Sequence, residues 1–138
     1  MKIQPSLYYL GMSCFPISLL SLLNIFYSYY FEYLLNVNSY IIVLVLSSTI
    51  GITFFLLGKS KKDEIGIYEQ IFLVFLIYIF CSFFILIPFY MSSYGITFID
   101  SYFESISGLT GTGFSTLTDI KNLDPPLIIW RSSSQWLG

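Results

Sequence analysis

Three long apolar stretches constrain the fold of this chain more than any other feature. They cover about residues 7–31, 39–57 and 65–90. Each reaches the ~20 residues that an α-helix needs to cross ~30 Å of hydrocarbon. Because backbone amides cannot stay unpaired in lipid, stretches of this length are expected to be helices in spite of their β-branched residues. The sequence therefore predicts an all-α membrane protein, with two transmembrane helices in residues 1–58 and a third in residues 65–90.

The composition agrees with membrane lipid as the main surroundings. Only 10% of the 138 residues are charged, against about 25% in an average soluble domain. The net charge of −2 comes without a basic patch, which excludes nucleic acid as a partner. The chain has no histidine, which removes the commonest general base and metal ligand. We therefore expect neither an enzyme nor a bound cofactor. Cys14 and Cys81 lie in apolar stretches without a CxxC partner, which favours buried, reduced thiols.

The lysines predict the orientation of the predicted spans. One lysine precedes the first span and three lie in the loop 59–64, whereas residues 32–38 and 91–120 contain no Lys or Arg. Cytoplasmic loops carry the excess of such residues. The N-terminus and the loop 59–64 are therefore expected in the cytoplasm, with Lys121 as a single exception. The lysines that carry this prediction are Lys2, Lys59, Lys61 and Lys62.

Residues 97–138 do not fit a simple span. Residues 97–109 make only ~18–20 Å of helix, too short to cross a bilayer. Ser101 with Glu104 forms a candidate capping box at the start of this helix, and Asp100 is an alternative cap. After a Thr/Gly run, Asp124 precedes two prolines that suit the first turn of another helix, residues 125–138. A short helix followed by a loop that returns to the same side is typical of a re-entrant pore loop, which is tolerated where it is buried in protein or lines a water-filled cavity.

The Thr/Gly run Thr110-Gly111-Thr112-Gly113-Phe114 is a candidate ion filter. Potassium filters replace the hydration shell of the ion with backbone carbonyls, and glycine permits the backbone angles that aim successive carbonyls at one axis. The short helix would also point its partially negative C-terminal end at a cation. Three other interpretations of this run are a dinucleotide-binding loop, a Walker loop and a plain turn. A dinucleotide fingerprint lacks its third glycine, because Thr116 stands there; no lysine follows as in a Walker loop; and composition alone slightly favours a plain turn.

From Ser101 onward the chain resembles the Trk/Ktr/HKT superfamily of potassium transporters. The residues that carry the resemblance are the run F-E-S-I-S-G-L-T-G-T-G-F-S at 103–115, Trp130-Arg131-Ser132 and the segment S-Q-W-L-G at 134–138. The family pattern is similar to F-E-S-x-S-G-L-T-T-T-G, followed by W-R-S-x-x-Q-W-L-G-G. One difference is Gly111, which stands where threonine is common, so one side-chain oxygen is missing while the carbonyl is kept. Before residue 100 the resemblance rests only on layout, in which 1–58 look like the extra N-terminal helix pair of bacterial Trk-type members.

The resemblance implies four helix–pore-loop–helix units around one pore. Residues 65–138 would form the first unit of this potassium-channel-like fold: outer helix 65–90, pore helix 97–109, filter 110–115 and the start of the inner helix at 125–138, where the chain stops. Potassium would be held transiently at Thr110, Gly111, Thr112 and Gly113, with Phe114 completing the segment. Gly113 matches the filter glycine that favours potassium, whereas serine there goes with sodium preference in plant relatives.

The resemblance also implies the surroundings of such a chain. It would act in potassium uptake across a bacterial cytoplasmic membrane, together with three further pore units. A nucleotide-binding regulatory subunit on the cytoplasmic face and a homodimer of the complete protein are implied as well. The alternative is a truncated remnant, or an associating fragment, that transports nothing, because the sequence ends inside the inner helix with one filter segment where a pore needs four.

Several single residues support these expectations. Arg131 lies about six residues into the last helix, where an unpaired charge is expensive, so we expect it to pair with Glu104 on the short helix; the alternative is that it snorkels to the interface. Together with Ser115, this pair is expected to support the filter. Asp119 and Asp124 either attract cations to the outer mouth or serve as loop and cap residues.

Overall fold

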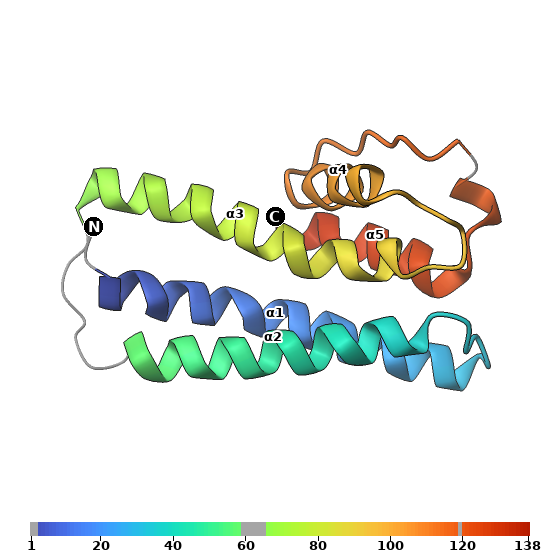
Figure 1. Cartoon of the computed structure of the whole chain (residues 1–138), viewed down its shortest axis with the longest axis horizontal. Helices are drawn as coiled ribbons and strands as arrows, with labels where there is room; N and C mark the ends of the chain where they lie inside the picture. Colours follow the sequence, from blue (N-terminus) through green and yellow to red (C-terminus); the bar gives the residue numbers. More distant parts are fainter. Residues whose placement is uncertain (1–2, 59–65, 119) are drawn as a thin grey trace.

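The computed structural model describes residues 3–58, 66–118 and 120–138, and the regular structure in these residues is helical (Figure 1). Lys2, the lysine loop 59–64 and Asp119, on which part of the sequence interpretation rests, lie outside the described residues. The helices follow the predicted stretches closely, with an added short 3-10 helix η1 before the last one. Their bounds are α1 Ile3–Tyr30, α2 Val37–Gly58, α3 Ile67–Tyr90, α4 Phe98–Leu109, η1 Ile120–Asn122 and α5 Pro125–Leu137.

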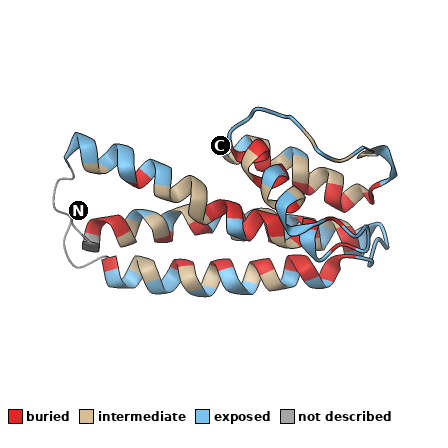
Figure 2. Cartoon of the chain, turned by 45° about the horizontal axis from the view of Figure 1, so that its top comes forward, coloured by how far each residue is buried: buried red, intermediate tan, exposed pale blue. Residues whose placement is uncertain are grey.

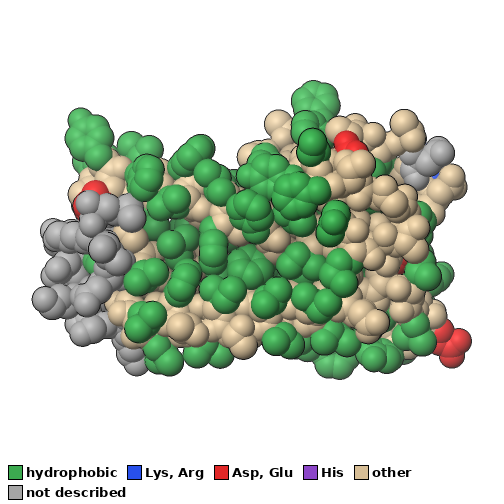
Figure 3. Space-filling model, viewed as in Figure 1, with side chains coloured by type: hydrophobic (Ala, Val, Ile, Leu, Met, Phe, Trp, Pro, Cys, Tyr) green, Lys and Arg blue, Asp and Glu red, His purple; other side chains and the backbone are tan. Residues whose placement is uncertain are grey.

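The first three helices have the length and composition of membrane spans. The apolar spans Pro5–Tyr30, Val37–Gly58 and Ile67–Tyr90 contain at least 22 residues each, or ~33 Å of helix. No more than 39% of the apolar window of any of them is buried inside the structure, and hydrophobic side chains cover much of the face seen in Figure 3. So large an apolar surface needs lipid or other protein to cover it. The fold is that of a multi-pass membrane protein.

Small residues let α1 and α2 approach closely as an antiparallel hairpin (Figure 1). A Cβ atom added to Gly11 would lie 2.5 Å from Phe55 N and 2.8 Å from Gly51 O. A Cβ atom added to Gly51 would lie 2.8 Å from Cys14 Cβ. Helices in lipid associate through close van der Waals packing of this kind. The acyl chains are as apolar as the side chains, so the hydrophobic effect does not drive the helices together.

The second half of the chain turns back on itself. α4 starts at the end of the bundle that holds the α1–α2 turn and stops part-way along α3, and residues 110–118 return to that same end (Figure 1). The predicted caps of α4 are wrong: Thr97 is the N-cap, and its Oγ1 accepts a hydrogen bond from Asp100 N at 3.2 Å. Ser101 and Glu104 are buried inside the molecule instead, so their side chains do not serve the exposed helix end.

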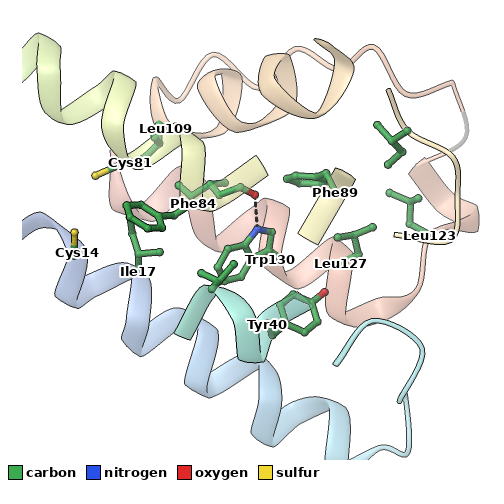
Figure 4. Close-up of a cluster of buried hydrophobic side chains, with 13 residues drawn as sticks. Cys14, Ile17, Tyr40, Cys81, Phe84, Phe89, Leu109, Leu123, Leu127 and Trp130 are labelled. Atoms are coloured by element: carbon green, nitrogen blue, oxygen red, sulfur yellow. Dashed lines mark hydrogen bonds between the residues drawn. The ribbon is translucent and has the colours of Figure 1, made fainter. Parts of the chain in front are cut away.

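α5 packs into the angle between the hairpin and α3 (Figure 4). Trp130 is buried at its centre, donates from Nε1 to Ile85 O at 3.0 Å, and lies 5.6 Å from the ring of Tyr40. Leu127 and Phe89 complete this contact. Figure 2 shows the buried residues in red. The buried hydrophobic cluster lies where the hairpin, α3 and α5 meet.

A designed disulfide tests the placement of α1 against α3. Ser13 Oγ lies 3.5 Å from Cys81 Sγ, and a disulfide needs ~2.05 Å between its sulfurs. We expect Ser13→Cys, made in a Cys14→Ala background, to crosslink to Cys81 under mild oxidation in membranes. Denatured crosslinked protein should then take up no maleimide-polyethylene glycol. Ser18→Cys in the same background is the control, because Ser18 is exposed and donates to Phe15 O of its own helix. Equal labelling of both variants would refute this packing.

Candidate ion-filter segment

Two glycines shape the loop that follows α4. The helix ends at Thr110, which is its C-cap with φ −81°. Gly111 and Gly113 then adopt φ +67° and +74°, the left-handed region in which a Cβ atom is strained. Gly111 N donates to Gly108 O at 3.0 Å, and Gly113 N approaches Ser107 O at 3.4 Å. The alternation of Thr and Gly therefore produces a tight, irregular turn and then an extended return.

Hydroxyl groups hold this turn against the last turn of α4. Thr110 Oγ1 and Thr112 Oγ1 lie 2.6 Å apart and share a hydrogen bond. Thr112 Oγ1 also donates to Ser107 O at 3.3 Å. Ser107 Oγ donates to Phe114 O at 2.6 Å, while the Phe114 ring itself is exposed. The threonines thus fix the backbone of the loop as well as offering oxygens.

A buried carboxylate connects the loop to both neighbouring helices. Glu104 is 1% exposed. Its Oε1 accepts hydrogen bonds from Ser115 Oγ at 2.5 Å and from Thr116 N at 2.9 Å, and its Oε2 accepts from Arg131 Nε at 2.9 Å. The ion pair expected from the sequence is therefore present. A buried charge needs such partners, because an unpaired one costs several kcal/mol.

Arg131 also contacts the loop directly. Its Nη2 donates to Gly113 O at 3.2 Å, so one guanidinium joins the carboxylate of Glu104 to a backbone carbonyl of the loop. A carbonyl oxygen has two lone pairs, and this bond leaves one of them for a cation. The negative Glu104 neutralises the positive Arg131, which would otherwise repel a cation at the same carbonyl.

The predicted site residues are all in one place. The segment Thr110–Phe114 is exposed, and Glu104, Ser115 and Arg131 lie directly behind it. Asp124 does not belong to this group: it is the N-cap of α5, is 9% exposed, and accepts a hydrogen bond from Asn36 Nδ2 at 2.9 Å. Burial raises the pKa of Asp124 above its ordinary value, and the Asn36 bond opposes that shift. Asp124 therefore has the N-cap position of α5, but its side chain makes no cap hydrogen bond and contacts Asn36 instead.

Three residues whose hydrogen bonds the structure shows, two at the loop and one at Asp124, were not singled out for these roles from the sequence. Ser107 follows Glu104 by three residues on α4, so both lie on one face of the helix. This spacing was the sequence signal that could have placed Ser107 near the loop. Thr116 acts through its backbone N–H, which carries no sequence signal. Asn36 contacts Asp124 across 88 positions of sequence, a distance over which no local pattern extends. Gly108 matters for packing, because a Cβ atom there would collide with the Ser134 hydroxyl of α5.

Fold and site together define a multi-pass helical membrane protein with a half-length helix and a polar return loop. Among the described residues, no group of three or more His, Cys, Asp or Glu side chains is placed to hold a metal ion. The site therefore offers backbone carbonyls, hydroxyls and one neutralised ion pair. These groups suit weak, multiple contacts with a cation better than tight binding.

Comparison with known proteins finds similarity to cation transporters. The chain is 27% identical over 104 residues to an uncharacterized cation transporter of Methanocaldococcus jannaschii, a match of 75% of this chain and 22% of that protein. It is 33% identical over 82 residues to the Trk system potassium uptake protein TrkH of Escherichia coli K12, covering 59% of this chain and 17% of that protein. TrkH of Salmonella typhimurium matches equally well. The chain spans about a fifth of the length of these relatives. No family model and no solved structure matches.

These matches support a relationship with Trk-type cation transporters. The relatives are named as transporters. The three apolar helices agree with the same class of membrane protein.

Proposed function

We propose that this chain supplies one of four selectivity-filter segments of a protein that takes up potassium across the cytoplasmic membrane. The observation that carries the proposal is the buried ion pair of Glu104 and Arg131, which ties the loop Thr110–Phe114 to a half-length helix and to α5. A plain turn between two helices needs no buried charges, which are costly inside a membrane and are retained there for function. The C-terminal end of α4 adds a partial negative charge beside the loop.

The remaining parts of the proposal follow from the resemblance to the Trk/Ktr/HKT superfamily. Residues 1–58 would be an N-terminal helix pair and residues 65–138 the first pore unit, with α3 as outer helix, α4 as pore helix and α5 as the start of the inner helix. Three further pore units would complete the pore, and the complete protein would form a homodimer with a nucleotide-binding regulatory subunit in the cytoplasm. The N-terminus would lie on the cytoplasmic side.

Growth at low potassium tests the proposal. A bacterium that lacks its own potassium uptake systems should grow at low external potassium when it expresses the complete coding sequence that contains this chain. Rubidium or thallium uptake into the same cells measures transport directly. Absence of rescue, with the protein present in the membrane, would contradict the potassium-uptake function.

Replacing Gly113 by serine is expected to lower the preference for potassium over sodium. Gly113 has φ +74°, so a side chain there strains the carbonyl that would face the ion, at a cost of roughly 1–2 kcal/mol. A tenfold fall in selectivity corresponds to about 1.4 kcal/mol. The matched control is Gly95→Ser, because Gly95 also has a positive φ of +66° with open space around it, outside the filter. Equal selectivity of the two variants would separate Gly113 from ion recognition.

A further inference from the structure

A buried polar cluster lies at the junction of the hairpin and α5, away from the filter loop. Asn36, at the start of the second helix, donates to Asp124 Oδ1 at 2.9 Å. The other carboxylate oxygen of Asp124 is buried and makes no hydrogen bond of ordinary geometry in the described part of the chain. The Tyr94 hydroxyl and the Leu127 backbone N–H lie near the carboxylate and lower the pKa of Asp124, against the effect of burial. A buried carboxylate that lacks part of its hydrogen bonds lowers the stability of the folded state.

The hydroxyl of Tyr40 faces the same place. Tyr40 is completely buried, and its OH also has no hydrogen-bond partner in the described part of the chain. Figure 4 shows the hydroxyl pointing toward Leu127, in the first turn of α5 that Asp124 caps. Tyr40 lies four residues, about one helical turn, after Asn36, whose side chain bonds to Asp124, so the two residues belong to the same junction. Two unsatisfied oxygens, one from each element, therefore meet at this junction.

α1 adds two more unsatisfied side chains to the same end of the hairpin. Ser21 Oγ donates to Tyr40 O at 2.5 Å, which fixes the register of α1 against α2. Asn24 and Ser28 follow on the same helix face, three and seven residues later. Both are buried, and Asn24 Nδ2 and Oδ1 and Ser28 Oγ have no partner among the described groups.

The outer edge of the cluster is formed by Tyr94. This residue lies in the connection between α3 and α4 and is partly exposed. Burial and the negative charge of Asp124 raise the pKa of Tyr94, and the side chains of the two residues interact. Asp124 is then the charged group of the cluster, at the N-terminal end of α5, where the helix dipole favours a carboxylate.

We propose that ordered water fills this junction and bridges the Asp124 carboxylate to the Tyr40 hydroxyl, docking the N-terminal hairpin onto α5. Buried polar groups in proteins find a protein partner or an ordered water, and a bound water makes about three hydrogen bonds. Together with the direct Asn36–Asp124 bond, the water would fix the start of α5. This inference is independent of the proposed transport function.

The sign of a stability change tests the proposal. If a water bonds to the hydroxyl of Tyr40, Tyr40→Phe removes that hydrogen bond and leaves the water with one partner fewer. The Tm of the purified chain in detergent should then fall by about 2–5 °C. If the junction is dry, the same change removes an unsatisfied polar atom and the Tm should stay the same or rise. An unchanged or higher Tm would overturn the proposal. Tyr9→Phe is the matched control, since Tyr9 is exposed on the lipid-facing side of α1.

Two further measurements complete the test. Asn24→Leu should also lower the Tm if Asn24 is hydrated, and should raise it in a dry junction. Tm values in sodium, potassium and choline chloride at equal ionic strength distinguish water from a bound alkali cation. Equal values support water. A Tm that sodium or potassium raises in the native chain, but not in Asp124→Asn, would show a cation in place of the water and overturn the proposal.

Discussion

Replacement of Glu104 by glutamine is expected to reduce cation uptake by roughly a hundredfold or more. Glutamine keeps the shape of the side chain but leaves the Arg131 guanidinium without a counter-charge, 3.2 Å from Gly113 O. A unit charge ~4 Å from another repels it by about 4 kcal/mol at an effective dielectric constant of ~20. The lost charge also weakens the bonds to Ser115 and Thr116. Uptake of rubidium at equal membrane expression measures the effect.

Two controls separate this electrostatic effect from misfolding. Asp100→Asn removes one negative charge from the same helix, but Asp100 lies at the start of α4 beside Thr97 and away from the loop, so uptake should change little. The double variant Glu104→Gln with Arg131→Gln removes both charges, and uptake should recover partly from that of the single variant. If Asp100→Asn is as harmful as Glu104→Gln, the ion pair has no special role at the loop Thr110–Phe114.

Replacement of Gly11 by leucine is expected to open the α1–α2 hairpin. Even a Cβ atom at this position would meet the backbone of α2, namely Phe55 N and Gly51 O. Backbone atoms cannot rotate away as a side chain does, so the two helices must separate along this stretch. We expect a loss of about 3 kcal/mol or more, at the upper end of the costs known for overpacked cores. Unfolding in mixed detergent and sodium dodecyl sulfate, followed by circular dichroism or tryptophan fluorescence, measures the loss.

The matched control for this variant is Gly66→Leu. Gly66 caps α3 with φ −64° and has no heavy atom within 4 Å of the position of an added Cβ. The same increase in side-chain volume should therefore leave stability nearly unchanged. Similar unfolding curves for the two variants would contradict the close approach of the helices at Gly11.

The helices were predictable because lipid leaves the backbone little choice. A stretch of ~20 apolar residues has to satisfy its own hydrogen bonds, and only a helix does so within one segment. The first three helices therefore match the apolar stretches 7–31, 39–57 and 65–90 to within a few residues. The prolines after Asp124 fixed the start of α5 in the same local manner. The N-cap of α4 was mispredicted because Thr97, Asp100 and Ser101 are all possible caps. Ser101 and Glu104 are buried in the structure, and Thr97 is the N-cap.

The Thr/Gly loop was predicted in position, and its partners were predicted in part. The pairing of Glu104 with Arg131 followed from charge alone, since a buried arginine needs an anion and Glu104 was the best candidate on the short helix. The pattern carried no information on which loop atoms share these charges. The bonds from Arg131 to Gly113 O and from Ser107 to Phe114 O depend on backbone angles of the turn.

The sequence by itself determined that this chain has helices fit to cross a membrane, where these lie to within a few residues, and that a short helix precedes a Thr/Gly loop. These properties depend on neighbours within about 20 residues and on the energy of burying a peptide group in hydrocarbon. Only the tertiary structure decided which helices touch, that Gly11 lies against the backbone of α2, and that Asn36 meets Asp124. Such contacts join residues that are far apart in sequence, and the shapes and unsatisfied polar groups of whole helices select them.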